Sequence, residues 1–113
     1  MLSHSTDNGG LKEAYKAYQV YKATHNITSH RLPGISHLSE DQLFFLSFGS
    51  VWCETQTLSA LAAQLQTDPH APAMTRVVGV LQNFDVFQTA YNCSNDSSMA
   101  KPFKDSEEQC KLW

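Results

Sequence analysis

The sequence predicts a mainly α-helical fold. Apolar and aromatic residues recur at helical spacing between Leu11 and Tyr21. A Ser-x-x-Gln capping signature at Ser39–Gln42 directly precedes a long apolar run. Proline and glycine fall between the periodic segments, as at Pro33-Gly34. With 113 residues, 42% of them hydrophobic, the chain has room for one core and hence one small domain.

The first predicted helix has Asp7 or Asn8 as its N-cap and continues to about Thr24. Gly9 and Gly10 would fall in its first turn, although each costs roughly 1 kcal/mol relative to alanine inside a helix. Two glycines there indicate a close backbone approach or a constrained start of the helix. Residues 25–38 are predicted to form a loop.

The second predicted helix begins after Ser39, with Glu40 and Asp41 in its positive first turn. From Leu43 to Trp52 it is apolar on nearly every side. Such a helix has to be covered on several faces. A chain of 113 residues offers few elements to do so, which indicates that more protein belongs around this helix.

Three shorter helices are predicted in the second half of the chain. They cover residues 57–65, 76–81 and 84–91, and the two prolines of residues 67–72 end the first of them. Residues 92–108 are polar and predicted to be looped. The helix over residues 57–65 is expected to turn four apolar residues inward: Leu58, Leu61, Ala62 and Leu65.

Charge and hydropathy argue against a nucleic-acid partner, a transmembrane segment and a secretory signal. Eleven acidic and eight basic residues give a net charge of −3 without a Lys/Arg cluster, so nucleic acid is not expected as a partner. No window approaches the ~18 consecutive apolar residues of a transmembrane segment. Residues 1–10 also lack the basic start and apolar middle of a secretory signal.

Two features nevertheless favour an extracellular context. Three N-glycosylation sequons are present, starting at Asn26, Asn92 and Asn95. The chain also has an odd number of cysteines, which in a secreted protein implies an outside partner or a free thiol. Three reduced cysteines of a cytosolic domain are the alternative. None of the three has C-x-x-C spacing: Cys53, Cys93 and Cys110.

Catalytic chemistry is best accommodated by Asp68, His70 and Arg76. These residue types can orient an imidazole, stabilise a developing oxyanion and hold a peptide carbonyl. Pro69 and Pro72 flank His70 and stiffen its loop, although a solvated histidine on a surface loop is the simpler interpretation. The other histidines lack the i, i+4 spacing of a helical metal site and are interpreted as loop residues: His4, His25, His30 and His37.

A family resemblance covers the chain from about Asp7 to Trp113. The chain resembles the C-terminal portion of the neprilysin and endothelin-converting-enzyme family of zinc metallopeptidases. The matching segments, in order, are Asp7-Asn8-Gly9-Gly10, Ala14-Tyr15, Ala17-Tyr18, Leu32-Pro33-Gly34, Gln42-Leu43-Phe44-Phe45, Val51-Trp52-Cys53, Thr67-Asp68-Pro69-His70-Ala71-Pro72, Arg76-Val77-Val78-Gly79, Leu81-Gln82-Asn83 and Cys110-Lys111-Leu112-Trp113.

The resemblance implies an incomplete domain. Residues 7–113 would be the C-terminal helical segment of a thermolysin-like (zincin) catalytic domain, and residues 1–6 a divergent start. Asp7 falls on the family's carboxylate that orients a zinc-binding histidine, although a helix cap is the simpler role for it. The position of the family's glutamate ligand is Ser3, and no H-E-x-x-H occurs. Zinc is therefore expected in the full-length parent and not in this chain alone.

The resemblance also assigns roles to the other candidate residues. His70 would stabilise the tetrahedral oxyanion, Arg76 would hydrogen-bond the substrate backbone, and Asp68 would orient one of the two. The three cysteines would pair with cysteines in more N-terminal parts of the parent polypeptide.

The expected function follows from these roles. The chain would be a fragment of a zinc metalloendopeptidase of the extracellular space or the plasma-membrane ectodomain, which cuts peptides on the amino side of hydrophobic residues. Its partners would be the peptide substrate and the rest of the parent peptidase, and alone it would be inactive. The alternative is a truncated, non-catalytic product that binds peptides or associates with a full-length relative.

Overall fold

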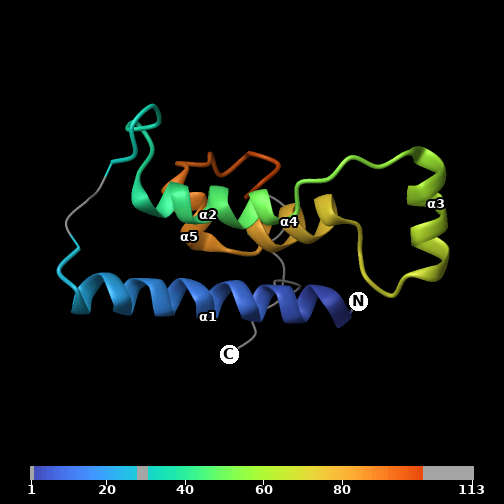
Figure 1. Ribbon diagram of the computed structural model, residues 1–113, viewed down its shortest axis with the longest axis horizontal. Coiled ribbons are helices and arrows are strands. Elements are labelled where there is room, and N and C mark those ends of the chain that lie inside the picture. The colour runs from blue at the N-terminus through green and yellow to red at the C-terminus, as the bar shows by residue number, and fades with distance from the viewer. Residues whose placement is uncertain (1, 28–30, 101–113) are drawn as a thin grey trace.

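The computed structural model describes residues 2–27 and 31–100, and within these ranges it contains five helices and no strand. The prediction of a mainly α fold is confirmed. The helices are α1 (Leu2–Thr24), α2 (Glu40–Val51), α3 (Leu58–Thr67), α4 (Ala73–Gln82) and α5 (Asp85–Ala90). In Figure 1, α1 runs along one side of the molecule, α2, α4 and α5 gather on the other, and α3 stands apart at one end.

The core lies where α1, α2, α4 and α5 meet. Phe45 of α2, only 2% exposed, is at its centre. Its ring is stacked 5.7 Å from that of Tyr15 and meets the rings of Phe84 and Phe87 edge-on at 5.6 and 5.4 Å. Aromatic pairs in these geometries contribute about 0.5–1.5 kcal/mol each beyond their buried area. Leu11, Val80 and Leu81 complete the buried cluster.

Helix α1 begins earlier than predicted. It starts at Leu2, so Asp7 and Asn8 lie inside the helix and neither is its N-cap. The cap prediction is therefore wrong: the Asp7 side chain bonds to Arg76 of α4, and that of Asn8 to Asn83, the C-cap residue of α4. A close backbone approach is also not found at Gly10, where an added Cβ would meet nothing within 4 Å.

The start of α2 is as predicted. The hydroxyl of Ser39 accepts from the backbone N–H of Gln42, and the Gln42 side chain accepts from the backbone N–H of Ser39. Gln42 also donates to the carbonyl of Ala90 at 2.9 Å, and the Tyr91 hydroxyl donates to the carbonyl of Gln42. The capping box thus fixes α2 against the end of α5.

The inward face predicted for the third helix is wrong. None of the residues of α3 is buried, and Leu58 and Leu65 are 85% and 65% exposed. The periodicity itself is helical, but α3 stands away from the other helices (Figure 1), so its apolar stripe stays exposed or, at Leu61, half-buried.

Helices α4 and α5 occur where the sequence placed helices. Helix α4 begins three residues earlier than predicted, directly after Pro72, and Phe84 is the N-cap of α5 rather than its first residue. The loop prediction for residues 25–38 holds in its described part, where Gly34 has the positive φ of +83° that favours glycine. No helix in the described ranges is both long and apolar enough to cross a bilayer.

Two polar contacts fix α1 against α4. The Asn83 side chain donates to the side-chain carbonyl of Asn8 at 2.9 Å, and each residue is 4% exposed. One residue away on α1, the carboxylate of Asp7 is bonded to Arg76. Buried polar groups are costly unless they are paired, so these contacts disfavour any other register between the two helices.

Candidate functional site

The candidate site begins with an ion pair between α1 and α4. The Nε and Nη2 atoms of Arg76 donate to the two carboxylate oxygens of Asp7 at 2.7 and 2.6 Å. The side chains are only 19% and 12% exposed, and 69 residues separate them in the sequence. The hydrogen bonds and the negative charge of Asp7 raise the pKa of the guanidinium. The bidentate geometry also fixes the direction in which the guanidinium points.

Trp52 covers one face of the same guanidinium. It is the C-cap residue of α2, and its ring centroid lies 4.0 Å from Cζ of Arg76. This distance is well inside the ~6 Å range of cation–π attraction. Arg76 is thus held by a carboxylate from α1 and an aromatic ring from the end of α2.

His70 is held locally by Asp68. Asp68 ends α3 as its C-cap, and one of its carboxylate oxygens accepts from the backbone N–H of His70 at 2.8 Å. The same oxygen lies 2.8 Å from Nδ1 of the imidazole. The backbone and ring hydrogen bonds of His70 hold the pKa of Asp68 below its ordinary value. A carboxylate at Nδ1 favours a proton on that nitrogen and turns Nε2 toward a ligand.

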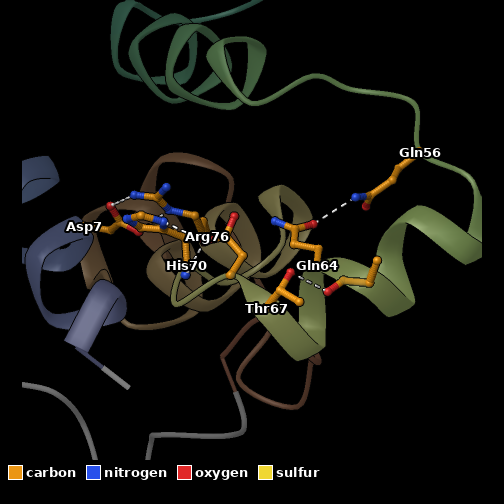
Figure 2. A network of polar contacts seen from close by, with 8 residues as sticks. Asp7, Gln56, Gln64, Thr67, His70 and Arg76 are labelled. Atoms are coloured by element: carbon orange, nitrogen blue, oxygen red, sulfur yellow. Dashed lines mark hydrogen bonds and ion pairs between the residues drawn. The ribbon is translucent and has the colours of Figure 1, made fainter.

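His70 and Arg76 share one pocket. The pocket has a volume of about 220 Å³. Figure 2 shows Asp7, His70 and Arg76 close together, with Gln56, Gln64 and Thr67 beside them on the α3 side. The lining residues are Trp52, Glu54, Gln64, Asp68, His70, Ala71, Ala73 and Arg76. The structure thus brings together the four residues singled out in the sequence: Asp7, Asp68, His70 and Arg76.

The contact of Trp52 with Arg76 was not predicted from the sequence. Its signal was present, since it is a tryptophan at the very end of an apolar helix. Its partner Arg76 follows 24 residues later, and no local pattern connects two residues across a helix boundary. Only the fold shows the contact.

The described residues do not fit a zinc ion. Among them, no group of three or more His, Cys, Asp or Glu side chains is placed to hold a metal. The carboxylate of Asp7 is engaged by Arg76. His25 and His37 are exposed and lie outside the pocket. The side chains of Ser3 and His4, and all of His30, fall outside the described residues.

None of the described cysteines and sequon asparagines is among the pocket-lining residues, although Cys53 stands between two of them, Trp52 and Glu54. Cys53 is exposed and Cys93 half-buried, both as free thiols, while Cys110 falls outside the described residues. The three sequon asparagines are exposed: Asn26, Asn92 and Asn95. Asn26 and Asn92 have positive φ values of 48° and 50°, a turn conformation that asparagine tolerates.

Comparison with known proteins shows the family of the chain. The sequence model of Peptidase family M13 matches residues 2–110, nearly the whole chain. Neprilysin-3 of Drosophila melanogaster is 39% identical over 107 residues, which are 95% of this chain. Endothelin-converting enzyme 1 and neprilysin of Homo sapiens are 42% and 40% identical over the same length. No solved structure gave a significant match.

The chain belongs to Peptidase family M13, the neprilysin family of metallopeptidases. It spans about 13% of the length of each of these three relatives. The family resemblance inferred from the sequence is therefore confirmed.

Proposed function

We propose that this chain is the C-terminal part of the active site of a neprilysin-type zinc metalloendopeptidase, which cuts extracellular peptides on the amino side of hydrophobic residues. The observation that carries the proposal is the pocket shared by His70 and Arg76, each held by its own carboxylate. Zinc would be bound by the rest of the parent peptidase, and the 113-residue chain alone would be inactive.

In this proposal, His70 and Arg76 each donate to the substrate from a nitrogen that their carboxylate partners do not engage. His70, with both ring nitrogens protonated, donates from Nε2 to the oxyanion that forms on the scissile carbonyl, while Asp68 accepts from Nδ1. Arg76 donates from Nη1, the nitrogen that Asp7 does not engage, to a carbonyl of the substrate backbone. Asp7 and Asp68 are positioning residues for these two donors.

A chimera tests the proposal. Residues 7–113 replace the matching segment of human neprilysin, and cleavage of a reporter peptide with a hydrophobic residue after the scissile bond is measured with and without a zinc chelator. The chimera is expected to cleave the peptide in a chelator-sensitive manner. His70→Ala should lower kcat by about 10²–10³, the cost of losing one oxyanion donor. His25→Ala, which removes an exposed histidine outside the pocket, is the matched control.

The opposite results are also informative. Equal activity of the His70→Ala and parent chimeras would refute the role of His70. Zinc-dependent cleavage by the isolated 113-residue chain would refute its inactivity.

The cellular setting is part of the same proposal. The exposed asparagines Asn26, Asn92 and Asn95 are accessible to glycosylation. We expect the three cysteines to pair with cysteines in the rest of the parent. An immunoblot of native tissue, with and without reductant, should then show a glycosylated band much heavier than 12.6 kDa. A band only near 12.6 kDa would contradict this setting.

A second candidate is a non-catalytic chain that associates with a full-length relative or binds peptides. The exposed apolar side chains favour it, since Val51, Leu58 and Met74 are 79%, 85% and 77% exposed. A stoichiometric complex of the isolated chain with a full-length relative, seen by size-exclusion chromatography, would support this candidate. An isolated chain that forms no such complex and binds no peptide would support the fragment instead.

A further inference from the structure

We propose that Trp52 is a positioning residue, which holds the guanidinium of Arg76 in the orientation that a substrate carbonyl requires. The inference rests on the proposed function of the pocket. It adds a residue that acts through Arg76 and assigns the end of α2 a part in substrate binding.

Asp7 and Trp52 restrain different motions of the Arg76 guanidinium. The two hydrogen bonds to Asp7 fix one edge of the guanidinium, through Nε and Nη2. They still allow the guanidinium plane to tilt about the edge that joins Nε and Nη2. The Trp52 ring, over which Cζ lies at 4.0 Å from the centroid, blocks a tilt toward the ring and so restrains that remaining motion. Together the two contacts define where Nη1 points.

Trp52 is itself anchored at the end of α2. As the C-cap of α2, its backbone N–H donates to the carbonyl of Gly49, and the N–H of Cys53 donates to the carbonyl of Ser50, both at 3.2 Å. Phe45, earlier in the same helix, is buried in the core and only 2% exposed. The ring therefore projects from an anchored helix end, which makes it an effective stop for a long, flexible arginine side chain.

Core packing does not account for the position of the Trp52 ring. Within the described residues, the buried cluster and the side chains packed against it do not include Trp52. The ring is half-buried and lines the pocket beside His70 and Arg76. The end of α2 thus contributes to the site what α1 contributes through Asp7, a restraint on the same arginine.

The catalytic test is a double-mutant cycle in the neprilysin chimera. Trp52→Leu keeps an apolar side chain but removes the aromatic face, and should raise KM about tenfold with a smaller change in kcat. Trp52→Phe keeps a face and should restore most of the affinity. In an Arg76→Met background, Trp52→Leu should change KM by less than about twofold, because the residue it acts through is gone.

A second measurement does not depend on activity. In the 113-residue chain, the Nε–H proton resonance of Arg76, assigned with Arg76→Met, should move downfield in Trp52→Leu, because the ring no longer shields it. An unchanged resonance would overturn the proposal. Equal effects of Trp52→Leu with and without Arg76 would also overturn it, and would mean that the ring contacts substrate directly. If the unmodified chimera fails to cleave, the proposed function fails, and the resonance alone decides the positioning role.

Discussion

The ion pair between Asp7 and Arg76 gives a prediction about stability that the structure makes quantitative. Asp7→Asn preserves shape and helix propensity but removes the charge that Arg76 faces at 2.6 and 2.7 Å. Truncating one charged hydrogen-bond partner costs about 1.5–3 kcal/mol. Two such bonds are weakened, but the side chains are 12% and 19% exposed and water can partly replace the carboxylate. We therefore expect a loss of about 2–3 kcal/mol.

The assay is thermal unfolding followed by circular dichroism, with chemical denaturation as a second measure of the free energy of unfolding. A loss of 2–3 kcal/mol corresponds to a fall in Tm of roughly 10 °C for a domain of this size. The matched control is Glu13→Gln on the same helix. Glu13 pairs with Lys16 at 2.7 Å, but those side chains are 58% and 63% exposed, and such pairs contribute at most about 0.5 kcal/mol. Equal effects of the two substitutions would refute the reasoning.

Three further predictions use the same chain. Phe45→Ala should destabilise it by about 3–5 kcal/mol, whereas Leu58→Ala, at an 85% exposed position, should stay within about 0.5 kcal/mol, both by urea denaturation. Gln42→Ala removes half of the capping box and the bond to the end of α5, so unfolding should become easier by about 1–2 kcal/mol in the same assay. The hydrogen bonds from His70 lower the pKa of Asp68 below its ordinary value. The pairing therefore stabilises the folded chain above about pH 4, and this contribution is lost as the pH falls through the folded-state pKa. A carboxyl NMR titration should show a midpoint that rises in His70→Ala.

The sequence was most informative where structure is local. The capping box at Ser39–Gln42 satisfies backbone groups within four residues, so its prediction needed no knowledge of the fold. The turn at Gly34 is local in the same sense. The Asp68–His70 contact also spans only two residues, and the flanking prolines indicate a stiff loop that holds the His70 side chain.

The failures arose where the partner lies far along the chain. Asp7 was interpreted as a helix cap because a carboxylate near a helix start usually serves that role. Its partner lies 69 residues away, which no periodicity can show. Helix α3 failed for a related reason, since an apolar stripe indicates that a face can be buried but not what covers it. The family resemblance placed Asp7 and Arg76 in one active site, but it did not show that they contact each other.

The two halves of the site depend on the fold in different ways. His70 is oriented by an acceptor two residues away, so its geometry requires only the loop between α3 and α4. Arg76 is oriented from α1 and α2, and its geometry requires that both helices are packed in register with α4. The buried bond between Asn8 and Asn83 sets that register one residue from Asp7. Substitutions in the helix core should therefore impair substrate binding through Arg76 before they disturb the histidine, because only the arginine depends on contacts that the whole bundle maintains.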